Sequence, residues 1–185
     1  TEVRQMVGRL DTKETVLERL AALKAYGQCS VVIDLIYGLP GQTMEVWEQD
    51  LADLVSSGVD GADLYQLNVF DGSDLNKDIA KGKVPAAATT AMQGDMFKFG
   101  RKYLDERSYR RLSAAHWSAN NRERSLYNIL AKAGVPMFPF GSGAGGNVDG
   151  YGMMLHRALK PYEDMVSRGE KPFMALMKQS ELQPV

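Results

Sequence analysis

The sequence predicts an α/β fold built on parallel strands, and three patterns in its first seventy residues carry that prediction. A near-continuous apolar run, Val31–Tyr37, ends at Gly38–Gly41, as is typical of strands that are covered on both faces in parallel sheets. A second strand-like run, Leu64–Phe70, follows about thirty residues later, with a helical pattern between the two runs. The segment therefore has the size and order of a βαβ unit.

Capping residues and apolar spacing predict the helices of this unit. Asp11 and Glu14 form a capping signal ahead of residues at helical spacing, and Gly27 is a natural stop. Thr43 is placed to cap the next helix. The apolar stripe of that helix is Trp47, Leu51, Leu54 and Val55.

The rest of the chain is predicted to mix helices and strands after a connector at residues 71–88, which glycine and proline punctuate. The elements expected beyond it are a helix over 89–107, an extended segment over 108–118, a helix over 121–133, a strand over 151–156, and helices over 158–166 and 172–178. We therefore expect the connector to separate residues 1–70 from residues 89–185.

Composition excludes several classes of function. The net charge of −1 with mixed acids and bases gives no basic surface for nucleic acid or anionic lipid. No apolar stretch has bilayer length and no signal peptide is visible, so we expect no membrane span and a cytoplasmic protein. The single cysteine, Cys29, suits a reducing compartment and excludes an iron–sulfur cluster held by cysteines of this segment alone.

Asp34 stands in the middle of the apolar run, where an unpartnered buried carboxylate costs several kcal/mol, so we expect it to be bonded. Strand alternation places Gln66 and Asn68 together on one face of the next strand. If both polar sets face the same side of a barrel, that side is a lumen for a polar ligand. The alternative is a buried aspartate that serves backbone amides or a lone Lys or Arg.

The run Phe140–Gly146 contains a literal G-x-G-x-x-G, but no helix start follows it, which excludes dinucleotide binding by that route. Two interpretations remain, a tight structural turn and a backbone brought close to a bulky flat ligand.

The histidines and arginines of the second half suggest binding rather than metal chemistry. His116 and His156 are too few for a typical histidine-rich metal site, so no metal site is expected in this segment. Arg122 and Arg124 suit propionate carboxylates, because guanidinium binds carboxylate bidentately. Solvated helix-surface charges are the alternative account of both arginines.

Several segments together resemble one family. The oxygen-independent coproporphyrinogen III oxidase-like group of radical S-adenosylmethionine (SAM) proteins is resembled by four parts of the chain, Val7–Arg9, Ile33–Thr43, Trp47 and Leu64–Leu67. Arg124–Asn128 and Phe140–Gly146 are most similar to its haem-utilisation branch, in which haem is opened anaerobically with methyl transfer from SAM.

The resemblance implies a fold and a missing part. The family fold is a partial (β/α)₆ barrel followed by a smaller α+β C-terminal domain. Residues 1–70 would then be the C-terminal part of the barrel, and 89–185 the substrate-side domain. The family's three-cysteine motif lies earlier in the barrel, which implies a [4Fe-4S] cluster held by cysteines upstream of this segment.

The resemblance also implies site residues. Arg9 and Asp34 stand where the family has an arginine and an aspartate that contact SAM. A family residue near Asn68 lines the adenosine side, and the alternation adds Gln66 to the SAM group. The substrate-binding residues that we expect are His116, Arg122, Arg124, Tyr127, Asn128, Gly143, Gly145 and Gly146, while no catalytic residue is assigned.

The implied function is part of a radical SAM enzyme, of oxidoreductase or methyltransferase type, that acts on haem or a related tetrapyrrole. Its partners would be that tetrapyrrole and an electron donor such as a flavodoxin or flavin reductase, and the segment alone would be inactive. The alternatives are an oxygen-independent coproporphyrinogen III oxidase and a non-catalytic haem-trafficking protein on the same scaffold. A plain oligomerising α/β domain would leave Asp34 unexplained.

Overall fold

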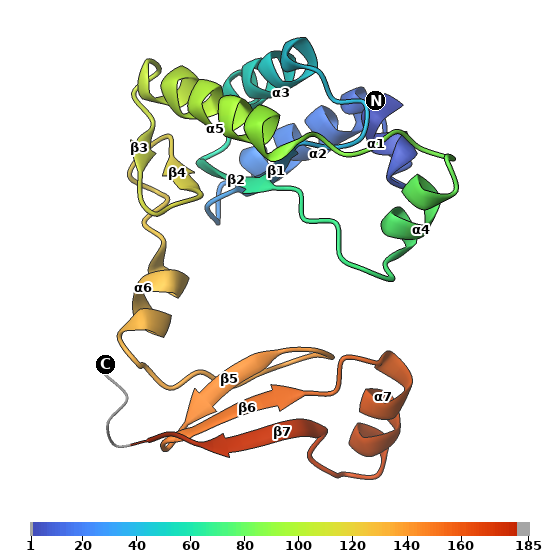
Figure 1. The fold of residues 1–185 in the computed structure, drawn as a ribbon. Coiled ribbons are helices and arrows are strands. Elements are labelled where there is room, and N and C mark those ends of the chain that lie inside the picture. The colour runs from blue at the N-terminus through green and yellow to red at the C-terminus, as the bar shows by residue number, and fades with distance from the viewer. Residues whose placement is uncertain (1, 181–185) are drawn as a thin grey trace. The chain divides into compact units, whose positions relative to one another are not determined.

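The structure is a computed structural model that describes residues 2–180, and the chain divides into two compact units, Thr1–Arg124 (unit 1) and Ser125–Val185 (unit 2). Figure 1 shows the elements of both units in chain order. Those of unit 1 are α1 (Glu2–Met6), α2 (Lys13–Tyr26), β1 (Val32–Tyr37), α3 (Met44–Ser57), β2 (Gly61–Gln66), α4 (Asp74–Ala80), α5 (Thr90–Asp105), β3 (Arg110–Arg111) and β4 (His116–Ser118). Those of unit 2 are α6 (Leu126–Lys132), β5 (Gly145–Val148), β6 (Tyr151–Leu155), α7 (Leu159–Ser167) and β7 (Phe173–Lys178).

The predicted βαβ unit is present in unit 1. Strands β1 and β2 pair in parallel with α3 between them in the chain, although β2 begins at Gly61 rather than Leu64. Strand β4 then pairs with β2 in the antiparallel sense, and the sheet order is β1-β2-β4-β3. The predicted α/β fold is confirmed, with an antiparallel hairpin where an extended segment was expected.

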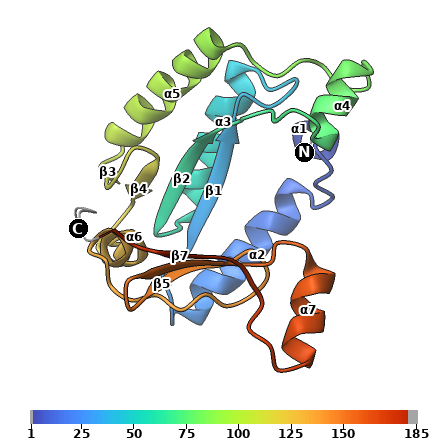
Figure 2. The same ribbon diagram turned by 60° about the horizontal axis from the view of Figure 1, so that its bottom comes forward.

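One face of this sheet carries the core. Helices α2, α3 and α5 pack with β1, β2 and β4 around fully or nearly fully buried residues (Figures 1 and 2). Trp47 of α3 ties the layers together, since its indole Nε1 donates to the carbonyl oxygen of Met96 on α5 at 2.8 Å. Within the described residues of unit 1, the other face, which we call the open face, lacks such a layer, and Asp34 and Ile36 of β1 are exposed there. The apolar run of β1 had predicted cover on both faces.

The helix ends follow local chemistry. The Thr12 side chain accepts from the amide of Thr15 and caps α2, one residue later than the Asp11 of the capping signal. Gly27 ends the helix with a left-handed φ of 70°, a conformation that costs glycine little. Thr43 caps α3 through the amide of Val46, as predicted.

The division between the units lies elsewhere than the predicted connector at 71–88. Helix α5 and strand β4, both placed in the second domain by the prediction, bury Met96, Leu104 and Trp117 in the core of unit 1. This burial holds residues 89–124 in unit 1, and the chain leaves it only after Arg124. The family roles of the two parts, barrel and substrate-side domain, stay predictions.

Unit 2 is a three-stranded antiparallel sheet, in the order β5-β6-β7, with two helices. Two element predictions fail here. The helix over 121–133 is shortened to α6 because the chain turns at Ser125, whose φ is 54°. The segment 172–178 is rich in helix-forming residues, yet it forms β7 because it pairs along β6 from Tyr151 to Leu155.

Across residues 2–180, no helix combines the length and apolar character that crossing a membrane requires.

Candidate functional site

The loop that follows β1 is shaped by its own glycine and glutamine. Gly38 has a φ of 85°, and a Cβ atom there would lie 2.6 Å from Nε2 of Gln93, so only glycine fits without a shift. The buried Gln42 side chain accepts from the amides of Gly38 and Leu39, at 2.7 and 3.1 Å, and donates to Asp50 at 3.2 Å. These contacts account for Gly38 and Gln42 of the G-L-P-G-Q string, which lies at the strand end where open α/β sheets bind ligands.

Asp34 lies on the open face of the sheet. It is exposed, and within the described residues of unit 1 no hydrogen bond or ion pair engages its carboxylate. The expectation of a buried, bonded carboxylate is therefore wrong, because helices cover only the face that carries Leu35. An accessible, uncommitted carboxylate on a rigid strand is suited to bind a ligand.

The register of the two strands decides which groups surround Asp34. Asp34 pairs with Asp63 and Ile36 pairs with Tyr65, so these side chains share the open face. Gln66 pairs with Tyr37 and alternates with Asp63 and Tyr65, so it does not belong to the face of Asp34 as predicted. The prediction separated the two faces of β2 correctly, but it placed the face of Gln66 beside Asp34. The register places the face of Asp63 and Tyr65 there instead.

Gln66 and Asn68 instead line a cavity of about 510 Å³ at the carboxyl end of β2. Tyr65, Phe97 and Arg111 contribute to the same cavity, so it combines aromatic faces with amide and guanidinium groups. The assignment of Gln66 and Asn68 to a SAM site stays a prediction.

Arg9 lines a second, smaller cavity of about 200 Å³, together with Leu35, Ile36 and Leu39 at the carboxyl end of β1. Arg9 itself is exposed. Ile36 connects the two predicted SAM residues. It lines the cavity of Arg9, and it lies on the same face of β1 as Asp34.

A row of titratable side chains crosses the open face from β1 to β4. His116 of β4 pairs with Asp63 in register, and its Nδ1 lies 3.0 Å from Oδ1 of Asp63. On its other side, Nε2 of the buried His116 lies 3.2 Å from Oε1 of Glu123, within ion-pair distance but outside hydrogen-bond geometry. The order of the row is Asp34, Asp63, His116 and Glu123, which we call the acid–imidazole row.

The acid–imidazole row alters the pKa of Asp34 and of the neighbouring Tyr65. Desolvation at the sheet surface raises the pKa of Asp34, the negative charge of Asp63 raises it further, and His116 acts in the opposite direction. Burial, together with the charges of Asp63 and Asp34, also raises the pKa of Tyr65. Across residues 2–180, no three His, Cys, Asp or Glu side chains are arranged to hold a metal ion.

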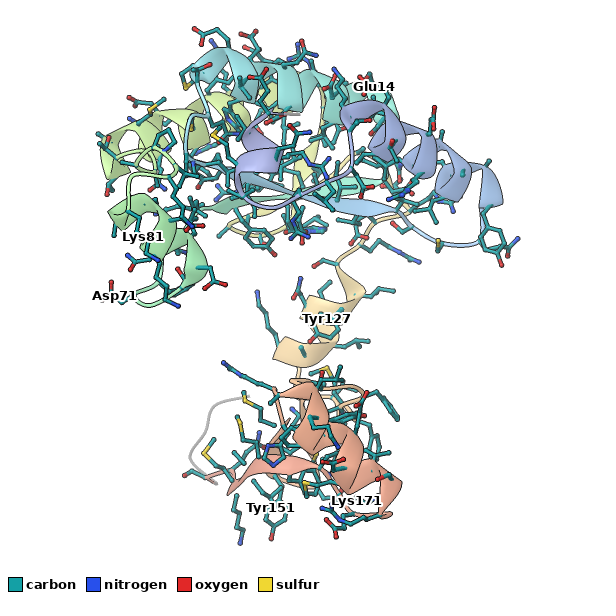
Figure 3. The ribbon with its side chains drawn as sticks, turned by 90° about the vertical axis from the view of Figure 1, so that its right-hand side faces the viewer. Glu14, Asp71, Lys81, Tyr127, Tyr151 and Lys171 are labelled. Carbon is teal, nitrogen blue, oxygen red and sulfur yellow. The ribbon has the colours of Figure 1, made fainter. Side chains whose placement is uncertain are left out.

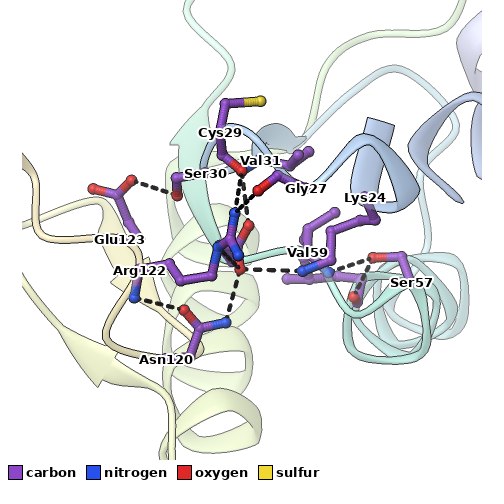
Figure 4. Close-up of polar contacts among 12 residues, drawn as sticks. Lys24, Gly27, Cys29, Ser30, Val31, Ser57, Val59, Asn120, Arg122 and Glu123 are labelled. Atoms are coloured by element: carbon purple, nitrogen blue, oxygen red, sulfur yellow. Dashed lines mark hydrogen bonds and ion pairs between the residues drawn. The ribbon is translucent and has the colours of Figure 1, made fainter. Parts of the chain in front are cut away.

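Arg122 is engaged in a structural network around the fully buried Asp60 (Figure 4). Its guanidinium donates to the carbonyl oxygens of Gly27 and Cys29 at 3.0 and 2.8 Å, and its Nε lies 3.6 Å from Asp60 Oδ1. Asp60 also accepts from the amide of Val31 at 2.9 Å. These contacts favour a structural role for Arg122 over propionate binding, although Arg122 and Arg124 are both exposed.

The remaining predicted residues lie in unit 2. Tyr127, labelled on α6 in Figure 3, is 71% exposed, and the Asn128 amide donates to Oγ of Ser125 at 3.0 Å. Gly143 has a φ of 75°, as a tight turn requires. A Cβ atom on Gly146 would collide with the carbonyl oxygen of Met137, so its close approach is to the chain's own backbone.

Unit 2 also holds an apolar cavity of about 540 Å³ that the sequence interpretation missed. Its aromatic lining comes from the segment before the glycine run, from β6, from α7 and from the start of β7, and consists of Phe138, Phe140, Tyr151, Tyr162 and Phe173. Lys171 is its cationic residue and Asp149 its anionic one. The aromatic pair in Phe138-Pro139-Phe140 was the available signal for it.

Asp63, Tyr65 and Glu123 are the polar residues of the open face that the sequence interpretation also missed. The alternation of β2 groups Asp63 with Tyr65, so the register of β1 against β2 would have been enough to find both. Glu123 comes from the turn after β4, and no local signal indicates its position.

Comparisons with known proteins give relatives over most of the chain. No protein-family model matches it. It is 36% identical over 181 residues, 98% of its length, to anaerobilin synthase of Escherichia coli O157:H7, and 27% identical over 78% of its length to the heme chaperone HemW of Lactococcus lactis. It is 29% identical over 63% of its length to the mitochondrial radical S-adenosyl methionine domain-containing protein 1 of Mus musculus.

A solved structure shares the fold. The radical SAM enzyme coproporphyrinogen III oxidase (HemN) of Escherichia coli matches 97% of this chain with a TM-score of 0.74 at 18% identity. The chain spans 40% of the length of the anaerobilin synthase, 38% of the HemW and 43% of the HemN structure.

Proposed function

This chain belongs to the HemN-like radical SAM family, which has haem-utilisation members, and from this premise we propose that it is part of an enzyme that opens haem anaerobically with methyl transfer. The observation that carries the proposal is Asp34, an uncommitted carboxylate on the open face of a sheet with the HemN fold. The 36% identity to an anaerobilin synthase favours this reaction over others of the family.

The open face has groups that fit SAM. The carboxylate of Asp34 can accept hydrogen bonds from hydroxyl or ammonium groups, and Tyr65 on the same face offers an aromatic ring. Arg9, at the carboxyl end of β1, can bind a carboxylate bidentately. When bound at a reduced [4Fe-4S] cluster, SAM supplies a carbon-centred radical. The part of these side chains is to place SAM, balance its charges and exclude water.

The described residues do not fit the cluster itself. Cys29 is the chain's one cysteine, it is exposed, and a cysteine-bound cluster needs several thiolates. We therefore place the cluster ligands upstream, in a longer protein. Anaerobic reconstitution of this chain with iron and sulfide should give no stable brown chromophore, and a chromophore with about four irons per chain would refute this assignment.

The proposed substrate is haem or a related tetrapyrrole, with unit 2 supplying apolar contacts. Its aromatic cavity suits a flat macrocycle, and Lys171 offers a cation to a propionate. Among the predicted propionate ligands, Arg124 is the better candidate because Arg122 already has partners. His116 instead belongs to the open face of unit 1. We also propose that the electron donor is a flavodoxin or flavin reductase and that the protein is cytoplasmic.

A variant of Asp34 tests the SAM site. In the longer protein, Asp34→Asn should weaken SAM binding about tenfold to a hundredfold, since hydrogen bonds to a charged group contribute about 1.5–3 kcal/mol. Calorimetric titration measures the affinity, and iron content should stay unchanged. Asp95→Asn is the matched control, because Asp95 is an exposed carboxylate on α5 paired with Lys98. Equal SAM affinity in folded Asp34→Asn would remove Asp34 from the site.

The substrate is tested by anaerobic incubation of the longer protein with SAM, a reductant and haem. We expect bleaching of the Soret band and a ring-opened, methylated product by mass spectrometry. Successive decarboxylations of coproporphyrinogen III would instead identify the oxidase, which the HemN-like fold favours as an alternative. Haem binding without turnover would identify a chaperone, the alternative that the similarity to HemW supports.

A further inference from the structure

We propose that His116 is a positioning residue that keeps Asp34 ionised by balancing the negative charge of Asp63 between them. The inference deepens the proposed SAM site and rests on it, because an ionised Asp34 is what that site requires. It concerns a residue that the sequence analysis had placed among the substrate-binding residues.

The register of the sheet creates the problem that His116 solves. Asp34 and Asp63 are directly opposite each other on adjacent parallel strands and share one face. Like charges in such cross-strand positions repel, which favours protonation of one of the two carboxyl groups. An uncharged Asp34 would bind a cationic ligand group poorly.

His116 lies on the far side of Asp63 from Asp34. It pairs with Asp63 in the antiparallel register of β2 and β4, and its Nδ1 is 3.0 Å from Oδ1 of Asp63. When Asp63 is ionised, its carboxylate can only accept, so Nδ1 of His116 then carries a hydrogen and donates it to Asp63. The bond draws negative charge of Asp63 toward β4 and away from Asp34.

A second carboxylate flanks the imidazole on its other side. His116 is buried, and its Nε2 lies 3.2 Å from Oε1 of Glu123, whose second oxygen accepts from Oγ of Ser30 at 3.2 Å. Gly61 makes room for this arrangement, since a Cβ atom there would lie 3.0 Å from Cγ of Glu123 and 2.7 Å from the carbonyl oxygen of Trp117.

The groups that face Asp34 give a consistent electrostatic account. They are Asp63 and Tyr65 on β2 and, one strand further, His116 on β4 with Glu123 behind it. Desolvation and Asp63 raise the pKa of Asp34, and His116 lowers it. Removal of His116 should therefore raise the pKa of Asp34 further, and additional removal of the charge of Asp63 should reverse that rise.

The test is an NMR titration of the Asp34 side-chain carboxyl carbon in this 185-residue chain without SAM. In His116→Ala the Asp34 titration should move to higher pH, and in His116→Ala/Asp63→Asn it should move back to lower pH. Asp63→Asn alone should also lower it, which keeps the inference testable if His116→Ala does not fold. Asp95→Asn should leave it unchanged.

An unmoved Asp34 titration in folded His116→Ala, or no reversal in the double variant, would overturn the inference. A role of His116 in packing alone would predict no reversal, because removing a charge does not refill a cavity. The proposed function fails separately, through unchanged SAM affinity in Asp34→Asn of the longer protein. In that protein, His116→Ala should weaken SAM binding most at low pH, with recovery as the pH rises, whereas unaltered pH dependence would contradict the inference.

Discussion

The two units use their apolar residues in opposite ways. Unit 1 buries a continuous cluster that joins α2, α3 and α5 to the sheet, with Trp47, Leu51 and Trp117 fully buried. In the described part of unit 2, Leu155 is the one large apolar side chain that is buried. Leu176 there is 53% exposed and Phe140 is 86% exposed.

This difference separates two kinds of candidate site. In unit 1, a packed core fixes the strands, so Asp34, Asp63 and His116 have defined neighbours on the open face. In unit 2, the predicted residues lie on a surface with much exposed apolar area, a feature typical of binding surfaces. Positioning of charged groups is therefore expected from unit 1, and apolar contact from unit 2.

The largest effect should come from Asp60→Ala, which removes the centre of the buried polar network of unit 1. Asp60 accepts from the amide of Val31, from Lys24 and from Asn120, and truncation leaves these donors without their carboxylate. We expect a loss of about 3–5 kcal/mol in the free energy of unfolding. Tryptophan fluorescence during urea unfolding measures it for unit 1, because Trp47 and Trp117 are the chain's two tryptophans.

The same network predicts a pH dependence. Burial opposes ionisation of Asp60, but the bonds from Val31, Asn120 and Lys24 outweigh it and hold its pKa below the usual 3.8. A lowered folded-state pKa stabilises unit 1 fully above the unfolded value and progressively less as the pH falls through the folded one. The acid loss of stability below about pH 4 should be smaller in Asp60→Asn, and an equal loss would assign it to other carboxylates.

A matched pair of leucine truncations tests the contrast between the cores directly. Leu51→Ala in α3 removes a fully buried side chain and should cost unit 1 about 3 kcal/mol, through lost burial and a cavity. Leu176→Ala on β7 should cost less than about 0.5 kcal/mol, since the side chain is already half exposed. Urea unfolding measures the first, and hydrogen exchange of the β6 amides the second. Comparable losses would show that unit 2 buries more than its structure indicates.

The glycine run of unit 2 should give a smaller loss than Leu51→Ala. Gly146→Ala should destabilise the β5–β6 hairpin by about 1–3 kcal/mol, because the new Cβ atom meets Met137 and Pro139. Gly145→Ala is the control, since its nearest neighbour there is the carbonyl oxygen of Met153 at 3.8 Å. Hydrogen exchange of β6 amides again gives the comparison. Equal stability of the two variants would contradict a structural role for Gly146 and favour the ligand interpretation of the run.

The sequence by itself determined the local features of this protein. Glycine punctuation, threonine caps and apolar spacing were enough to predict β1, α3 and the loop at Gly38–Gly41, because each depends on backbone preferences within a few residues. The same string, with Asp34 in it, carried the resemblance to the family. Asp34 was singled out because it was expected to be buried, and that expectation was wrong. Burial of a strand residue depends on which helices cover the strand, and the strand's own sequence does not show this.

Only the tertiary structure decided which groups act together. Alternation gave two sets of side chains on β2, but the pairing of Asp34 with Asp63 selected the one beside Asp34. Antiparallel pairing brought His116 to Asp63 from 53 positions away, and pairing with β6 turned the helix-forming segment 173–178 into a strand. These outcomes depend on contacts between segments that are distant in the sequence. The energies of such contacts outweigh local preference, and the contacts leave no pattern in a single stretch of sequence.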